Sequence, residues 1–166
     1  LHTDYSDGMM SPEETVVTIS QETDLRVIAI TDHDTAEGAL LARSFARSKG
    51  LNLEVVVGQE ITTDQGDVLA LYIEESLPRF ATAAEAVDAI HRLGGLAVAP
   101  HPFFVGWWAM ESVHVRIRTL PFDAIEARHG CPLSSPGNGV TRLVNRWLGQ
   151  RLPEMGNSDA HIPYAA

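Results

Sequence analysis

Short apolar runs recur along the chain and alternate with segments of helical character. The runs are typical of buried β-strands and span residues 26–31, 53–61, 68–73, 96–100, 122–127 and 155–157. Apolar residues at helical spacing occupy 12–21, 35–49, 82–93 and 138–152. Strands that alternate with helices predict an α/β fold in which right-handed crossovers join parallel strands.

The helix boundaries carry recognisable signals. Ser11 precedes Pro12 and stands three residues before Glu14, which is the pattern of a capping box with proline at the first helical position. Thr82 and Glu85 form a second such pair. The last helix is expected to group four apolar side chains on one face: Leu143, Val144, Trp147 and Leu148.

Clusters of histidine and carboxylate residues stand at the chain start and beside the predicted strands. They read LHTDYSDG at 1–8, TDHD at 31–34, GQE at 58–60, APHP at 99–102 and NSDAH at 157–161. The last four lie at the carboxyl ends of predicted strands. In a barrel those ends converge on one mouth, whereas in an open sheet they line an edge. The clusters therefore favour a barrel or a near-barrel.

Eight residues in or near these clusters are candidate metal ligands. They are His2, Asp7, His33, Glu60, Asp67, His101, Asp159 and His161. Histidine and carboxylate without cysteine suit divalent Zn, Mn or Fe. The donors outnumber the needs of one tetrahedral ion and fit two or three ions that share a carboxylate. A lone histidine after a strand is more often a cap or a surface residue, so the joint pattern carries the prediction.

Composition narrows the class of protein. A length of 166 residues predicts one domain over 1–166, and a net charge of −10 argues against binding to duplex DNA. The lone Cys131 excludes an internal disulfide and favours a reducing cytoplasm. No apolar run approaches the ~18 residues of a membrane span. The chain starts at Leu1 and ends soon after NSDAH, so we expect its first residues and a closing C-terminal segment to be missing.

The motifs resemble, in order and from end to end, the signatures of the PHP (polymerase and histidinol phosphatase) family. The opening motif of that family reads His-x-His-Thr-x-x-Ser-Asp-Gly, and His2 matches its second histidine. The first histidine would precede Leu1. The resemblance implies a distorted (β/α)7 TIM-like barrel with a metal site at the C-terminal ends of its strands.

The resemblance also implies how two ions are held. His2, Glu60 and Asp159 would hold one ion, and Glu60 would bridge to a second ion that His101 also holds. Asp67 stands where many family members have a histidine. This carboxylate would still bind and would shift the preference towards Mn or Fe over Zn.

A third group, Asp7, His33 and His161, would hold another ion or contact the phosphate. In this reading Glu60, His33 and Asp7 carry the catalysis. The implied activity is that of a phosphoric ester hydrolase, in which metal-activated hydroxide attacks a phosphomonoester or a small nucleotide phosphate. The short connection between Glu60 and His101 leaves no room for the helical insertion of several nucleotide-specific family members, which predicts an open site.

Four further residues are weighed for substrate contact. Arg128 and His129 follow a predicted strand and are expected to face the mouth, although Arg128 also fits a surface position. Trp107 and Trp108 would stack on a base or form an apolar lid or partner surface.

Two flanking acids have expected supporting roles. Asp34 is expected to cap the helix that follows it. Asp32 is expected to orient a metal ligand.

Two other functions stay open. One is a non-catalytic or regulatory PHP module, as in family members fused to polymerases. The other is a metal-dependent amidohydrolase, which typically bridges its ions with a carboxylated lysine. Lys49 is the one lysine of the chain and lies at a predicted helix end, so this alternative fits poorly. The oligomeric state is left open.

Overall fold

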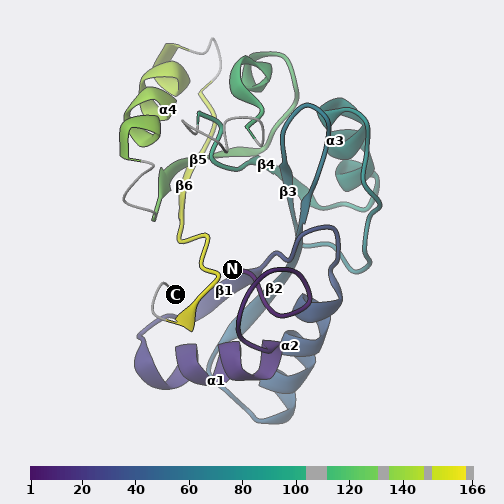
Figure 1. Cartoon of the computed structure of the whole chain (residues 1–166), viewed down its shortest axis with the longest axis vertical. Helices are drawn as coiled ribbons and strands as arrows, with labels where there is room; N and C mark the ends of the chain where they lie inside the picture. Colours follow the sequence, from purple (N-terminus) through teal and green to yellow (C-terminus); the bar gives the residue numbers. More distant parts are fainter. Residues whose placement is uncertain (104–111, 131–134, 148–150, 164–166) are drawn as a thin grey trace.

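Six strands form one curled sheet, and they follow the chain order from β1 to β6. The computed structural model describes residues 1–103, 112–130, 135–147 and 151–163. The strands are β1 (Val27–Ile30), β2 (Glu54–Ile61), β3 (Val68–Leu71), β4 (Leu96–Ala99), β5 (Ala124–His129) and β6 (Glu154–Asn157). Figure 1 shows the sheet curving around an interior, with the helices outside it.

The helices are α1 (Pro12–Glu22), α2 (Glu37–Ser48), α3 (Ala83–Arg92) and α4 (Ser135–Trp147), with a 3-10 helix η2 (His114–Arg118). Both predicted capping boxes are confirmed. Ser11 and Thr82 each accept a hydrogen bond from the backbone N–H of the glutamate three residues later, and that glutamate accepts from the cap residue. Across the described ranges, no helix has the length and apolar character that crossing a bilayer requires.

The predicted cap of α2 is wrong. Ala36 precedes the helix and makes no side-chain cap. Asp34 has a φ of 56° and turns its carboxylate to Thr62, whose backbone N–H it accepts at 2.9 Å. Asp34 therefore ties the end of β1 to the end of β2 instead of capping α2.

The apolar face predicted for α4 is wrong at two of its four residues. Leu143 and Trp147 are exposed, Val144 packs against the core, and Leu148 lies outside the described residues. The helix also buries Thr141 and Asn145. Asn145 accepts from the backbone N–H of Leu152 and donates to its carbonyl, both at 3.0 Å. These polar contacts with the chain leading to β6 thus hold α4 together with the packing of Val144.

Strand direction differs from the prediction at β3. β1 pairs with β2, and β4 with β5 and β5 with β6, in parallel, but β3 is antiparallel to both β2 and β4. Only residues 62–67 join β2 to β3, whereas a parallel crossover needs about a dozen residues or more. The chain therefore turns back directly, and β3 starts where β2 ends.

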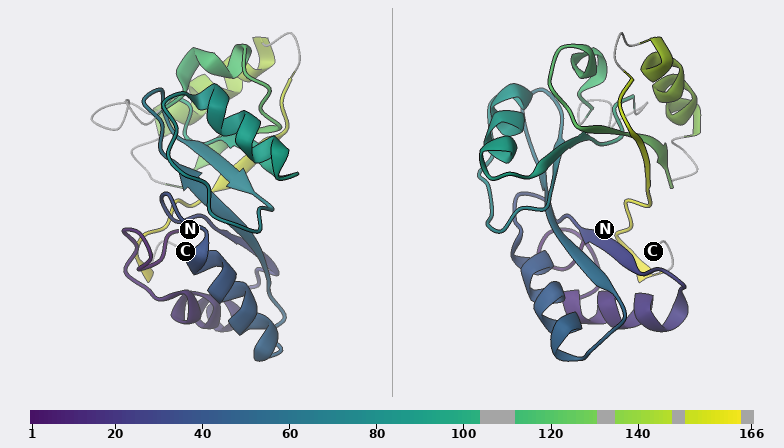
Figure 2. Two further views of the ribbon diagram at one scale, coloured as in Figure 1. Left: turned by 90° about the vertical axis from the view of Figure 1, so that its right-hand side faces the viewer. Right: turned by 180° about the vertical axis from the view of Figure 1, so that it is seen from behind.

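The described residues form a curled half-barrel and do not show the full (β/α)7 barrel. Among the described strands, β1 and β6 do not pair with each other. The start of the chain lies between their ends, because the Thr31 N–H donates to the Leu1 carbonyl at 2.8 Å and the His2 N–H donates to the Ala160 carbonyl at 3.0 Å. Figure 2 shows the N-terminus of the chain on this side of the sheet, beside β1.

Apolar residues pack on both faces of the sheet. The main core lies between the outer face and the helices and includes Ile30, Val57 and Ile90. The inner face carries a smaller cluster with Val56, Leu69 and Val98. An apolar cavity of about 580 Å³ lies beside this cluster, lined by β1, β2, β3 and β6.

Candidate metal centre

The carboxyl ends of β1, β2, β4 and β6 bring the predicted ligands together. His33 follows β1 and forms a parallel bridge with Glu60 in β2. His101 comes two residues after β4, and Asp159 and His161 follow β6. Side chains far apart in sequence therefore meet at one end of the sheet, as the strand-end pattern predicts.

Asp67 reaches the same place by a different route. It immediately precedes β3, and the antiparallel direction of β3 puts its start at the carboxyl end of β2. A parallel β3 would have carried Asp67 to the opposite end of the sheet. The hairpin is thus the reason that this carboxylate lies near Glu60 and His101.

Three adjoining groups of donors result. Within each group, one ligand atom per residue lies within 4.8 Å of the others. The groups are His2, Asp7, His33 and His161; His2, Glu60 and Asp159; and Glu60, Asp67 and His101. All eight predicted ligands belong to a group, and the role of each as a ligand stays a prediction.

Glu60 joins the two buried groups. Its Oε1 lies 3.0 Å from His101 Nε2, and its Oε2 lies 3.3 Å from His2 Nε2. His2 Nε2 is also 3.0 Å from Asp159 Oδ1. The two oxygens of Glu60 thus point to different groups, which is the arrangement that a bridging carboxylate requires.

The third group lies on the solvent side. The Asp7 side chain is 57% exposed, and its Oδ2 is 3.2 Å from His161 Nε2. The His161 ring stacks on His2 with 4.2 Å between centroids, and His33 Nε2 is 3.9 Å from Asp7. This group is therefore accessible from solvent.

Close contact between histidines and carboxylates shifts their pKa values. Burial by itself would lower the pKa of His2, but hydrogen bonds to Asp159 and Glu60 outweigh it and raise the pKa to about 9. Glu60 likewise outweighs burial at His101 and raises its pKa to about 9. Burial favours the neutral forms of Glu60 and Asp159, yet the neighbouring histidines hold both pKa values well below the usual range.

These shifts predict how pH acts on the metal-free protein. A raised histidine pKa stabilises the fold fully below the unfolded value of 6.5, and this contribution is lost as the pH rises through about 9. In a chelating buffer, we expect the free energy of unfolding to fall by about 5 kcal/mol between pH 7 and 9.5, about half of it from each histidine. Urea titrations at several pH values measure this fall.

A matched variant tests whether these histidines cause the fall in stability. His101→Asn removes one of the two histidines, so its curve should be flatter over the same range. A wild-type stability that does not change between pH 7 and 9.5 would contradict the prediction.

The described donors fit divalent metal ions. Each group combines imidazole nitrogen with carboxylate oxygen, which is a set for Zn, Mn or Fe. His2 Nδ1 is buried and has no hydrogen-bond partner within the described ranges, and Asp7 lies 3.6 Å from it. Buried polar atoms are normally satisfied; with a cation at Nε2, the imidazole proton would stay on Nδ1 and face the Asp7 carboxylate, which would accept it.

The two predicted substrate contacts differ in position. His129 is buried, and its Nε2 lies 3.2 Å from Asp159 Oδ2, so it borders the metal groups and holds Asp159. Arg128 is exposed, and neighbouring side chains of a strand point to opposite faces. Contact of Arg128 with substrate therefore stays a prediction without support from this geometry. Trp107 and Trp108 lie outside the described residues.

One buried acid was missed by sequence reasoning. Glu126 in β5 is 2% exposed and accepts the backbone N–H of His101 at 2.7 Å. Burial raises its pKa to about 7. The available signal was a glutamate inside an otherwise apolar strand, FDAIEA.

Asp32 also differs from its expected role. Its carboxylate accepts from the Thr3 backbone N–H at 2.5 Å, the Thr3 hydroxyl at 2.8 Å and the Ser6 hydroxyl at 3.0 Å. It holds the loop that carries His2 and Asp7 rather than a metal-ligand side chain.

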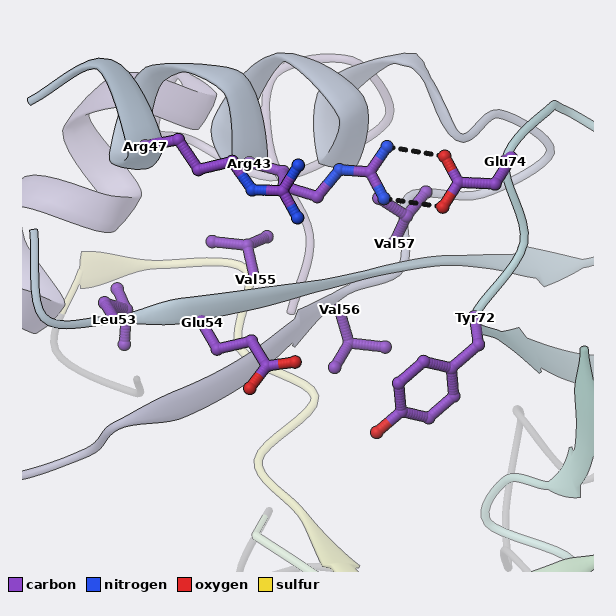
Figure 3. A pocket seen from close by; sticks show the side chains of 9 residues that line it. All are labelled: Arg43, Arg47, Leu53, Glu54, Val55, Val56, Val57, Tyr72 and Glu74. Atoms are coloured by element: carbon purple, nitrogen blue, oxygen red, sulfur yellow. Dashed lines mark hydrogen bonds and ion pairs between the residues drawn. The ribbon is translucent and has the colours of Figure 1, made fainter. Parts of the chain in front are cut away.

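A groove along β2 is separate from this centre. Figure 3 shows the Arg43 guanidinium paired with Glu74 on one side of β2, with Arg47 on the same side, whereas Glu54 and Tyr72 point to the other side. No residue of the three metal groups lines it. Lys49 also lies apart from the centre, at the end of α2, with its Nζ 5.5 Å from the Phe45 ring.

Solved structures share this fold. The chain superposes on a two-domain protein of Bacteroides vulgatus that contains a predicted PHP-like metal-dependent phosphoesterase, with a TM-score of 0.73 and 22% identity. The match covers 99% of this chain and 51% of that one. An amidohydrolase of Chromobacterium violaceum gives a TM-score of 0.70 and 16% identity over 98% of this chain and 86% of its own. At these identities the likeness shows the fold alone.

Sequence comparison gives two informative relatives. No protein-family model matches the chain. The 5'-3' exoribonuclease Rnm of Salmonella typhimurium is 42% identical over 62 residues, which are 37% of this chain and 21% of that protein. The uncharacterized protein MJ1587 of Methanocaldococcus jannaschii is 32% identical over 122 residues, covering 74% of this chain and 68% of its own length. This extent of identity shows that the chain belongs to the same family as MJ1587.

Proposed function

We propose that the protein is a PHP-type metal-dependent phosphoesterase that hydrolyses a phosphomonoester or a small nucleotide phosphate. The observation that carries this proposal is the set of three adjoining donor groups, two of which share Glu60. The fold of the neighbouring solved structures, which are named as a phosphoesterase and an amidohydrolase, supports a metal-dependent hydrolase in general. The choice of a phosphoester as substrate rests on the sequence motifs that resemble those of the PHP family.

The protein residues divide into three roles. His2, Glu60 and Asp159 would hold one ion, and Glu60, Asp67 and His101 a second. Bound divalent ions would polarise the phosphoryl oxygens and lower the pKa of water. Glu60 would fix the separation of the two positions, because its two oxygens serve different groups.

The solvent-side group would receive the substrate. His33 and His161 side chains are 32% and 31% exposed, so their ring nitrogens are accessible. As imidazolium, either would donate a hydrogen bond to a phosphate oxygen, and as imidazole either would bind a third ion. Asp7 lies between them and would orient their rings.

Metal analysis combined with a substrate panel tests the proposal. Purified protein would be assayed for bound metals and then incubated with Mn, Zn, Fe or Mg and four substrates: an aryl phosphomonoester, an aryl phosphodiester, a nucleoside monophosphate and a short RNA. We expect bound divalent metal and hydrolysis of the monoester that a chelator abolishes. Metal binding without hydrolysis of any substrate would favour the non-catalytic module and overturn the proposal.

The short RNA in this panel tests a second candidate activity, the hydrolysis of RNA. The 62-residue match to the exoribonuclease Rnm includes only a fifth of that protein, so its substrate does not transfer to this chain directly. Stepwise release of mononucleotides from RNA, with slow hydrolysis of the monoester, would replace the small substrate of our proposal with a nucleic acid.

A further inference from the structure

A buried acid outside the three donor groups contacts one of their members. Glu126 lies in β5, one strand away from His101, and is 2% exposed. Its Oε2 accepts the backbone N–H of His101 at 2.7 Å, while its Oε1 is buried and finds no hydrogen-bond partner among the described residues. Burial of a carboxylate oxygen without a hydrogen-bond partner destabilises the fold. The presence of Glu126 at this position is therefore better explained by a role in the donor groups than by a contribution to stability.

The backbone of His101 shows what that requirement is. Its φ is 26°, in the left-handed region, which a residue with a side chain adopts only where its surroundings hold it there. The Ser112 hydroxyl donates to the His101 carbonyl at 2.7 Å, and Ser112 is itself 2% exposed. Buried side chains from two different segments thus bind the amide and the carbonyl of His101.

This backbone conformation determines where the imidazole points. His101 comes two residues after β4, and an extended residue there would continue the strand direction. With the left-handed turn held at both backbone groups, His101 Nε2 lies 3.0 Å from Glu60 Oε1. Release of the turn would swing the ring away from Glu60 and Asp67.

We infer that Glu126 is a positioning residue: with Ser112 it holds His101 in a strained turn and so forms the Glu60–Asp67–His101 group. The inference deepens the proposed function and rests on it for the role of the metal. Glutamine at position 126 keeps an acceptor oxygen for the His101 N–H, whereas alanine has none. Comparison of the two variants therefore separates the loss of the hydrogen-bond acceptor from the loss of the negative charge.

Calorimetric titration of the metal-free protein with Mn²⁺ tests the inference. Glu126→Ala should weaken one class of Mn²⁺ site by about 10–100-fold and leave the others within about twofold, whereas Glu126→Gln should stay close to wild type. Asn145→Ala is the matched control, since Asn145 is also buried and polar but hydrogen-bonds near β6. It should lower the unfolding temperature without changing Mn²⁺ affinity.

A second readout does not depend on metal or on hydrolysis. In the metal-free protein, the ring NMR signals of His101 report its contact with Glu60. They should shift in Glu126→Ala and remain in place in Glu126→Gln. Unchanged His101 signals and unchanged Mn²⁺ affinity in Glu126→Ala would overturn the inference. Absence of hydrolysis in the wild type, with the expected shifts in these variants, would overturn the proposed function alone.

Discussion

Replacement of Glu60 by glutamine should reduce hydrolysis of the phosphomonoester by ~10³-fold or more and remove the paired ions. Glu60 is 2% exposed, and each of its oxygens lies about a hydrogen-bond length from a different histidine, at 3.0 and 3.3 Å. Glutamine has the same shape but offers one oxygen and one amide nitrogen. The amide nitrogen does not bind a cation, so one of the two buried groups loses a ligand and the shared bridge is broken.

Glu54→Gln is the matched control for this substitution. Glu54 lies in the same strand but is exposed and belongs to none of the donor groups. Its variant should retain wild-type turnover and metal content. Elemental analysis and steady-state kinetics on both variants measure the difference. If Glu60→Gln kept both ions and full turnover, the bridging role would be wrong.

The convergence of the candidate ligands could be predicted because it depends on strand ends. His33, His101 and Asp159 each follow an apolar run, and any sheet that places those runs side by side brings their ends together. The two capping boxes were also visible, because a cap is a local interaction within four residues. These parts of the fold follow from short stretches of sequence.

The direction of β3 required non-local information. Apolar runs at 53–61 and 68–73 look alike whether the strands pair in parallel or antiparallel. The length of the connection, residues 62–67, was the available signal, because no helix fits into it. A parallel β3 would have put Asp67 at the opposite end of the sheet from Glu60 and His101.

Polar interactions account for the other differences. Leu143 and Trp147 have the spacing of a buried face, but α4 turns Thr141 and Asn145 inward because Asn145 binds the backbone of Leu152. The position of Glu126 inside an apolar strand was a sign of burial, but it did not identify a partner. Its partner, the His101 amide, lies 25 residues away and is brought close only by the pairing of β4 with β5.

Substitution of Asp32 by alanine should destabilise the fold by about 4 kcal/mol and weaken metal binding at the groups that contain His2. Asp32 is fully buried and accepts three hydrogen bonds from the opening loop, two from Thr3 and one from Ser6. Without the carboxylate, these donors are left unsatisfied. His2 adjoins Thr3, so the displacement of Thr3 carries His2 away from Glu60.

Two further variants distinguish loop displacement from loss of charge. Gly38 in α2 packs so closely that a Cβ there would lie 2.3 Å from Asp32 Oδ2 and 2.7 Å from Thr3 Oγ1. Gly38→Ala should therefore disturb the same loop while Asp32 is retained. Asp24→Ala removes an exposed carboxylate and should change neither stability nor metal affinity.

Urea titration and Mn²⁺ calorimetry on the three variants measure these effects. If Asp32→Ala bound Mn²⁺ as tightly as wild type at every site, the loop would not deliver His2 to the centre. Asp32→Ala and Gly38→Ala could both lose Mn²⁺ affinity at the groups that contain His2 and retain it at the Glu60–Asp67–His101 group. The opening loop and the sheet would then supply their ligands independently. Asp32 contacts Thr3 and Ser6 rather than a ligand side chain, so such a loss would have to pass through the backbone of the opening loop.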